Sequence, residues 1–440
     1  MRVNLFKINK NRFSFLFALL TFRSVLDYSY YYIVSDIFAY EGFLAATTIS
    51  QYALSWLLYI ISFGFVSDRV KKVSHYFFAM AVLSVVAPLT SLYGLDDTKS
   101  LIPVLVTLGA LYIIYYISRF GIINLRALPV VPGGRSFAVA LSLTFVCFLV
   151  IWFLISGARP NLDFREVYQY REVNSQLAAG GIFSYTNNWT YQVFSIYLIS
   201  FALYYRKYII VFLLLLIQLY FFSIASHKAI LFLPFLVFGS WMYFRFSNSL
   251  LALPIVFTAV LVVTITSYII AGDIWLTSLL SRRVFFVPAN LCFVYFDFFG
   301  TNPNVYWSNS ILSAFLTYPY GDLGVPYVIG EYLGRPGMGA NNGFVSSGFA
   351  HAGLLGVVFY SVIIGVILKL LNDMTRENMP IWVAVALSVV PLRSLLTTSD
   401  LFTVMLTHGF GIAIVLIYLS RVSRSSSLAP SHGQENKGNK

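Results

Sequence analysis

Arginines recur in two stretches of a chain that is otherwise poor in charge. Arg165 and Arg171 lie within 163–179, which contains no Pro or Gly and is rich in helix formers. At 100° per residue, Arg165, Tyr168 and Glu172 share one helix face. An arginine holds phosphate through a planar fork of donors, and a tyrosine stacks on a sugar ring. The face therefore fits phosphate or sugar binding, or alternatively a solvated surface helix whose arginines and acidic residues neutralise each other.

The second stretch, 281–299, places Arg282 and Arg283 beside two phenylalanines. Paired arginines at an outer membrane surface suit a lipid-linked pyrophosphate, although snorkelling anchors would have the same composition. Asp297 follows among tyrosine and phenylalanine residues. An apolar setting suits a carboxyl group to acid–base work, and the alternative is an ion pair between Asp297 and one of the two arginines.

A glycine-rich stretch over 324–361 adds Glu331, Arg335, Asn341 and Asn342. Its sequence GMGANNG is not followed by the GK[ST] of a nucleotide-binding loop. The two asparagines are expected either to bond sugar hydroxyls or to cap the final helices. His351, near the start of the next apolar run, fits a packing role or a catalytic one equally well.

Other ionisable residues fall within or beside apolar runs, where such groups default to functional candidates. Arg23 and Asp27 are four residues apart, which predicts a structural salt bridge. Lys228 follows an apolar run and could complete a cationic site. Arg393 and Asp400 flank a turn between the last two apolar runs.

The composition of the chain predicts the helices that position these residues. Of 440 residues, 59% are hydrophobic and only 10% are charged, against about a quarter charged in a soluble domain. The apolar runs are continuous and close to 20 residues long, which excludes a disordered chain and a transmembrane β-barrel. The sequence predicts an all-α polytopic membrane protein with about 12 transmembrane helices. No disulfide is expected between Cys147 and Cys292.

Charge orients the expected helices. Most of the 29 lysines and arginines lie on one side, so both termini are predicted to be cytoplasmic. The basic start followed by a long apolar run predicts a first membrane helix rather than a removed signal peptide. Two long loops, about 158–190 and 272–350, then face outward, and loops of this length are usually functional. We expect one membrane domain over 1–420, and a disordered cytoplasmic tail over 421–440. The net charge of +12 orients the protein and does not indicate a nucleic-acid partner.

Some chemistries have no signal in the sequence. It has no HExxH, CxxC or His cluster at metal-ligand spacing, and no Walker A motif. We therefore expect neither a metal nor a cofactor.

Three segments carry a family resemblance: SHKAILFLPFLV (226–237), RRVFFVPANLCFVYFDFF (282–299) and ANNGFVSSGFAHAGLLGVVFYS (340–361). With the polytopic pattern and its two large loops, they resemble bacterial O-antigen polymerases of the Wzy type. The resemblance implies a membrane-embedded, GT-C-like glycosyltransferase in the inner membrane, with its active site facing the periplasm. Donor and acceptor would both be oligosaccharides linked to undecaprenyl pyrophosphate in the bilayer, without a metal. A chain-length regulator and a flippase are further candidate partners.

The resemblance also implies roles for the residues above. Charge stabilisation and acid–base catalysis would fall to Arg165, Arg171, Arg282, Arg283, Asp297 and Glu331. Substrate binding would fall to Tyr168, Lys228, Arg335, Asn341, Asn342 and Arg393. Two alternatives stay open: an O-antigen ligase, which passes the finished chain to lipid A core, and a flippase or other transporter of the repeat unit. Flippases usually have short loops and two similar halves, and neither feature is apparent in this sequence.

Overall fold

The computed structural model describes residues 10–119, 129–158, 160–161, 183–225, 228–310, 312–375 and 379–421. This part of the chain is helical and contains no strand, which confirms the all-α prediction. Seven of its helices are long and apolar enough to cross a membrane. They are Val73–Leu95, Ile102–Arg119, Gly134–Ile155, Tyr208–Ala225, Ala252–Ala271, Ile274–Thr301 and Phe344–Thr375. Four shorter apolar helices accompany them, and the count of twelve spans stays a prediction.

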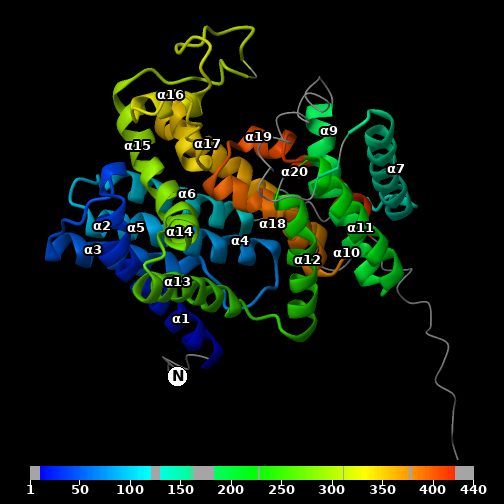
Figure 1. Ribbon diagram of the computed structural model, residues 1–440, viewed down its shortest axis with the longest axis horizontal. Coiled ribbons are helices and arrows are strands. Elements are labelled where there is room, and N and C mark those ends of the chain that lie inside the picture. Colours follow the sequence, from blue (N-terminus) through cyan, green and yellow to red (C-terminus); the bar gives the residue numbers. More distant parts are fainter. Residues whose placement is uncertain are drawn as a thin grey trace, which may run out of the picture.

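The helices in chain order form a bundle (Figure 1). The first half consists of α1 (Lys10–Ser29), α2 (Ser35–Ile37), α3 (Ile49–Ile61), α4 (Val73–Ala81), α5 (Ala87–Leu95), α6 (Ile102–Arg119), α7 (Gly134–Ile155), α9 (Phe183–Trp189) and α10 (Ser195–Tyr204). The second half consists of α11 (Tyr208–Ala225), α12 (Lys228–Phe246), α13 (Ala252–Ala271), α14 (Ile274–Leu276), the π-helix η7 (Thr277–Phe286), α15 (Val287–Thr301), α16 (Val325–Tyr332), α17 (Phe344–Thr375), α18 (Ile381–Thr397), α19 (Leu401–Leu406) and α20 (Phe410–Leu419).

Close helix pairs build the interior. α17 packs along α6, α3 along α5, and α1 along α13. At the α6–α17 contact, a Cβ on Gly365 would lie 2.7 Å from the Cβ of Ile117, so only glycine allows this approach. Small residues are the usual means by which membrane helices pack closely, because lipid supplies no hydrophobic force between them.

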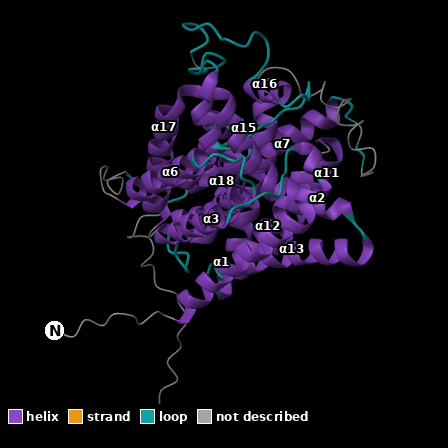
Figure 2. Cartoon of the chain, turned by 90° about the vertical axis from the view of Figure 1, so that its left-hand side faces the viewer, coloured by secondary structure: helices purple, strands orange, loops and turns teal. Residues whose placement is uncertain are grey.

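The two ends of the bundle can be told apart by their contacts. At one end, Gly343 at the start of α17 lies against the carbonyl of Leu396 near the end of α18, and the Lys99 ammonium lies 6.0 Å from the Phe293 ring centre. At the other end, the backbone N–H of Ser74 donates to Asn372 Oδ1 at 3.1 Å. The charge bias predicts that the first end faces outward and the second faces the cytoplasm. Figure 2 shows α15 and α16 at the edge of the bundle opposite the N-terminus.

The expected outward loop over 272–350 is largely helical instead. Its first part, Ile274–Thr301, forms α14, η7 and α15 without interruption. Ser281 hydrogen-bonds Ser29 of α1 at 2.6 Å, and the Phe296 ring stacks on Phe349 of α17 at 3.9 Å. The reason is the run of phenylalanine and tyrosine in this stretch, which is stabilised by burial against other helices.

Candidate functional site

Two arginines contact one carboxylate at the predicted outer end, and a third, Arg283, lines the same cavity as that carboxylate. Glu41, at the end of a short 3-10 turn after α2, accepts a hydrogen bond from Arg282 of η7. Its other oxygen lies 3.5 Å from a guanidinium nitrogen of Arg335. Arg282 also lies over the Phe38 ring, 4.4 Å from its centre. Residues from three distant parts of the sequence therefore form one cluster, which we call the outer arginine cluster: Glu41, Arg282, Arg283 and Arg335.

Local backbone geometry brings the cluster together. Gly42 follows Glu41 with φ of +86°, a left-handed conformation that ends the turn and that glycine adopts at low cost. Gly334 has φ of +68° and turns the chain after α16, so that Arg335 points back toward Glu41. η7 is a π-helix, a form that recurs at functional sites.

A cavity of about 360 Å³ adjoins the cluster and is called the cationic cavity here. Arg283, Arg335 and Glu41 line it together with apolar side chains that include Val287 and Leu333. The three arginines of the cluster exceed its one carboxylate by two charges. The cavity can thus hold an anion beside an apolar group.

One buried acceptor in the cationic cavity lacks a partner. Asn290 is buried on α15, and its Oδ1 has no hydrogen-bond partner among the described residues. A buried polar group without a hydrogen-bond partner destabilises the folded protein, so a water or a ligand hydroxyl is expected to bind it. Asn290 thus offers an acceptor to a bound molecule.

A second cavity of about 300 Å³ lies beyond the chain segment 340–342, and we call it the hydroxyl-rich cavity. Tyr295 donates to the carbonyl of Ala340 at 2.9 Å, so this segment forms a wall between the two cavities. The polar side chains that line the hydroxyl-rich cavity are those of Tyr185, Tyr295, Asn309, Ser310, Asn341, Asn342, Ser347, His351, Ser399, Asp400, Thr403 and Thr407. Amides, hydroxyls and aromatic rings in one cavity suit a sugar.

An Asp–His pair anchors the floor of this cavity. The Nε2 of His351 lies 3.4 Å from Asp400 Oδ2, and the backbone N–H of Trp307 lies 3.2 Å from His351 Nδ1. Tyr360 donates to the same Asp400 oxygen at 2.6 Å, while the Phe402 N–H donates to the other oxygen at 2.8 Å. Burial alone would raise the pKa of Asp400, but these donors outweigh it and the pKa is lowered. Asp400 is therefore held as a carboxylate.

The break in α17 explains how His351 is placed. Ala352 and Gly353 leave helical geometry, and Gly353 has φ of +58°. The carbonyls freed by this break accept from the loop before α16: Val305 N–H donates to Ala350 at 3.0 Å, and Tyr306 N–H donates to His351 at 2.8 Å. The loop is thereby tied to the helix beside the hydroxyl-rich cavity.

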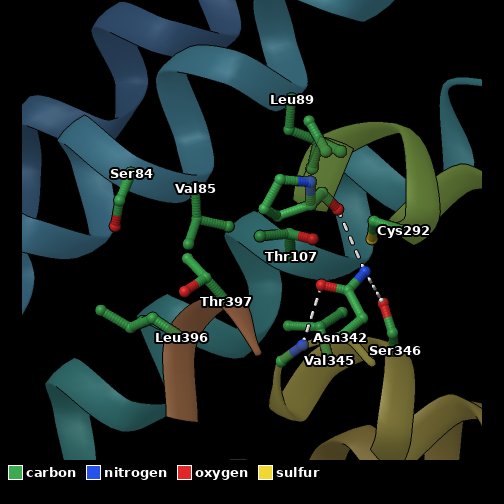
Figure 3. Close-up of a pocket in the computed structure, with 13 residues that line it drawn as sticks. Ser84, Val85, Leu89, Thr107, Cys292, Asn342, Val345, Ser346, Leu396 and Thr397 are labelled. Carbon is green, nitrogen blue, oxygen red and sulfur yellow. Dashed lines mark hydrogen bonds between the residues drawn. The ribbon is translucent and has the colours of Figure 1, made fainter. Parts of the chain in front are cut away.

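Asn342 is held by structural hydrogen bonds just before the start of α17. Its amide nitrogen donates to the Pro288 carbonyl at 3.0 Å and to Ser346 at 2.9 Å, and its oxygen accepts from the Gly343 N–H at 2.8 Å. Figure 3 shows these bonds beside a cavity of about 20 Å³, which has room for about one water next to Thr107. Asn342 has no spare donor for a sugar, whereas Asn341 is exposed at the hydroxyl-rich cavity.

The remaining predicted site residues either line neither cavity or lie outside the described part of the chain. Asp297 and Glu331 are exposed, form no salt bridge with a described residue, and line neither cavity. The predicted alternative that Asp297 pairs with Arg282 or Arg283 is therefore wrong. Arg393 is exposed on α18 and also lines neither cavity. Arg165, Tyr168, Arg171 and the side chain of Lys228 lie outside the described residues.

Sequence reasoning missed Glu41 and Asn290, and left His351 and Asp400 off the list of site residues. Glu41 sits in a short outer turn, YEGF, and its position beside a glycine was its only signal. Asn290 lies in an apolar helix, where one amide gives no pattern. Among the described residues no group of three His, Cys, Asp or Glu could hold a metal ion.

Comparison with known proteins adds no relative. No family model, curated protein or solved structure matches the chain.

Proposed function

We propose that the protein is an O-antigen polymerase that joins oligosaccharide repeat units linked to undecaprenyl pyrophosphate at the periplasmic face of the inner membrane. The observation that carries the proposal is the outer arginine cluster beside the cationic cavity, with its excess of two positive charges and its apolar wall. A pyrophosphate diester carries two negative charges and, in this substrate, an apolar polyprenyl chain. Charge and apolar surface are thus matched at one place.

The reaction breaks one bond and forms one. The bond between the sugar C1 and the pyrophosphate oxygen of the donor breaks, and undecaprenyl pyrophosphate leaves with the electron pair. A hydroxyl oxygen of the acceptor repeat unit bonds to that C1 and loses its proton. Arg283 and Arg335, which line the cavity, stabilise the negative charge that develops on the leaving oxygen.

The acceptor sugar would occupy the hydroxyl-rich cavity. Asn341 and the tyrosines there supply donors and stacking faces, and segment 340–342 keeps the two cavities adjacent. Asp297 and Glu331 are exposed and line neither cavity, so neither is assigned the proton of the acceptor hydroxyl, which passes to water. Glu41 is engaged by two arginines, so its role is to position them.

The test is the lipopolysaccharide ladder of a null strain that carries single variants. We expect Arg171→Ala, Arg282→Ala and Arg283→Ala to shorten or abolish the ladder, because each removes a cation assigned to the leaving group. Arg245→Ala, near the opposite end of the bundle, is the matched control and should leave the ladder unchanged. Unchanged chain length in all three variants would contradict the site assignment.

The null strain itself separates the three functions. A single repeat unit on the lipid A core indicates a polymerase. A core without any repeat unit indicates a ligase, and repeat units that accumulate in the cytoplasmic leaflet indicate a flippase. The orientation is checked with a reporter that is active only outside the cytoplasm, fused near Asn174 or Asn309. An inactive reporter at both positions would show that the site faces the wrong side.

A further inference from the structure

A third cavity, of about 220 Å³, lies at the predicted cytoplasmic end between α1, the 62–72 turn, α4 and α6. Four basic residues line it: Arg12, Lys72, His75 and Arg119. Three serines add hydroxyl groups, and no Asp or Glu is among the lining residues. We call it the basic cavity. It shares no lining residue with the cationic or hydroxyl-rich cavity.

The cations of the basic cavity are held in place by the fold. Arg12 donates to the Val66 carbonyl at 2.8 Å and to the Phe63 carbonyl at 3.3 Å, which fixes its guanidinium across the end of the 3-10 turn after α3. The Arg119 guanidinium lies 4.4 Å from the centre of the Tyr115 ring. α4 begins at Val73, so its amino-terminal dipole adds positive potential at the same place.

Neighbouring carboxylates are engaged elsewhere. Asp68 lies 3.8 Å from Arg69, and Asp373 of α17 forms an ion pair with Lys369. No described carboxylate lines the cavity beside Arg12 and Arg119, so the cavity attracts an anion.

We infer that the basic cavity binds the phosphate group of an anionic phospholipid. Phosphate is the anion that two guanidinium groups and a lysine suit best. The surroundings favour a lipid over free phosphate, because Phe13, Phe17 and Tyr116 are exposed on α1 and α6, the two helices that carry the arginines. These apolar surfaces can contact acyl chains while the headgroup enters the cavity. Basic pockets between membrane helices on the cytoplasmic side are known to hold such headgroups.

The test measures lipid binding to the purified full chain in detergent. The probes are short-chain phosphatidylglycerol, short-chain phosphatidylcholine and inorganic phosphate, and native mass spectrometry gives the apparent dissociation constants. We expect phosphatidylglycerol to bind at least tenfold more tightly than the other two. At about 1 kcal/mol for one charge near a membrane surface, Arg119→Gln should weaken its binding about fivefold.

Arg245→Gln is the matched control, because Arg245 lies over the Trp241 ring near the same end yet lines none of the three cavities. It should change the affinity less than twofold. Arg12→Gln should weaken phosphatidylglycerol binding more than Arg119→Gln does. If the Arg12 variant fails to fold, the affinity of Arg119→Gln still tests the inference. Equal affinity for phosphatidylcholine, or unchanged affinity in Arg119→Gln, would overturn the inference. Inorganic phosphate binding as tightly as phosphatidylglycerol would overturn the lipid assignment in favour of a free anion.

Discussion

Two arginine–carboxylate groups of this chain differ in how completely their atoms are bonded. Inside the bundle, Arg23 is fully buried and donates to Asp27 at 2.7 Å, to Thr90 at 2.6 Å and to Ser55 at 3.1 Å. Tyr52 donates to the second oxygen of Asp27 at 3.1 Å. Each of the three nitrogens of this guanidinium has a partner, and its complete burial keeps the group away from solvent.

The outer arginine cluster is bonded incompletely. The Nε of Arg282 has no partner among the described residues, and Arg335 is 41% exposed. Arg283 forms no ion pair with a described carboxylate and faces the cationic cavity. We infer a binding role for an arginine in an apolar chain when its donors exceed its partners and a cavity adjoins it. A fully buried arginine whose three nitrogens are all hydrogen-bonded within the bundle stabilises the fold instead.

The largest expected effect is on the inner pair. Arg23→Met leaves Asp27 as an uncompensated buried charge and should lower the free energy of unfolding by about 3–5 kcal/mol. Thermal denaturation in detergent measures the change. The double variant Arg23→Met/Asp27→Leu removes both charges and should regain much of the lost stability. A double variant no more stable than the single one would show that the buried charge of Asp27 does not cause the loss.

A smaller effect is expected when the centre of the outer cluster is neutralised. Glu41→Gln frees two guanidinium groups that the carboxylate positions, and this should reduce polymer yield by about 30-fold, or about 2 kcal/mol. The measure is polymer formed from purified lipid-linked repeat units. Asp322→Asn, a carboxylate in the same outer region that lines neither cavity, is the control. Full activity in Glu41→Gln would remove Glu41 from the site.

A still smaller effect is expected at the exposed edge of the cluster. Arg335→Gln removes one of two arginines that line the cationic cavity, but its exposure weakens the interaction through solvent screening. We expect the activity to fall about tenfold, mainly through a higher KM for the donor. A loss of activity as large as that of Arg283→Gln would show that solvent exposure does not weaken the contribution of Arg335.

The smallest effect concerns Asp400, which holds the floor of the hydroxyl-rich cavity. Asp400→Asn weakens the bonds from Tyr360 and His351 and should cost about 1 kcal/mol of stability. The pKa of Asp400 is lowered in the folded protein, so its contribution is present above the ordinary pKa of an aspartate and is lost as the pH falls through the lowered value. The stability gap between wild type and variant should therefore narrow in acid, and a gap that widens would reverse this sign.

The parts predicted from sequence follow from strong, local signals. Long apolar runs predicted the helices, and four-residue spacing predicted the pair between Arg23 and Asp27, which the structure confirms. Arg282, Arg283 and Arg335 were singled out because cations on the outer side oppose the charge bias.

The parts that were missed depend on contacts between distant segments. Glu41 becomes central only because a turn after α2 meets η7 and the loop after α16, 241 or more residues later in the chain. The helical course of 274–301 was read as a loop, because a π-helix and an aromatic run give no clear period of 3.6. His351 and Asp400 meet only through the fold, since no sequence spacing predicts their contact.

The most direct test of the central claim is the polymerisation rate of purified Arg283→Gln, measured with lipid-linked repeat units alongside its thermal stability. Arg283 lines the cationic cavity without forming an ion pair with a described residue, so its charge is assigned to the leaving pyrophosphate. The account predicts a rate about 100-fold lower with the melting temperature unchanged. A variant that polymerises at the wild-type rate would contradict it.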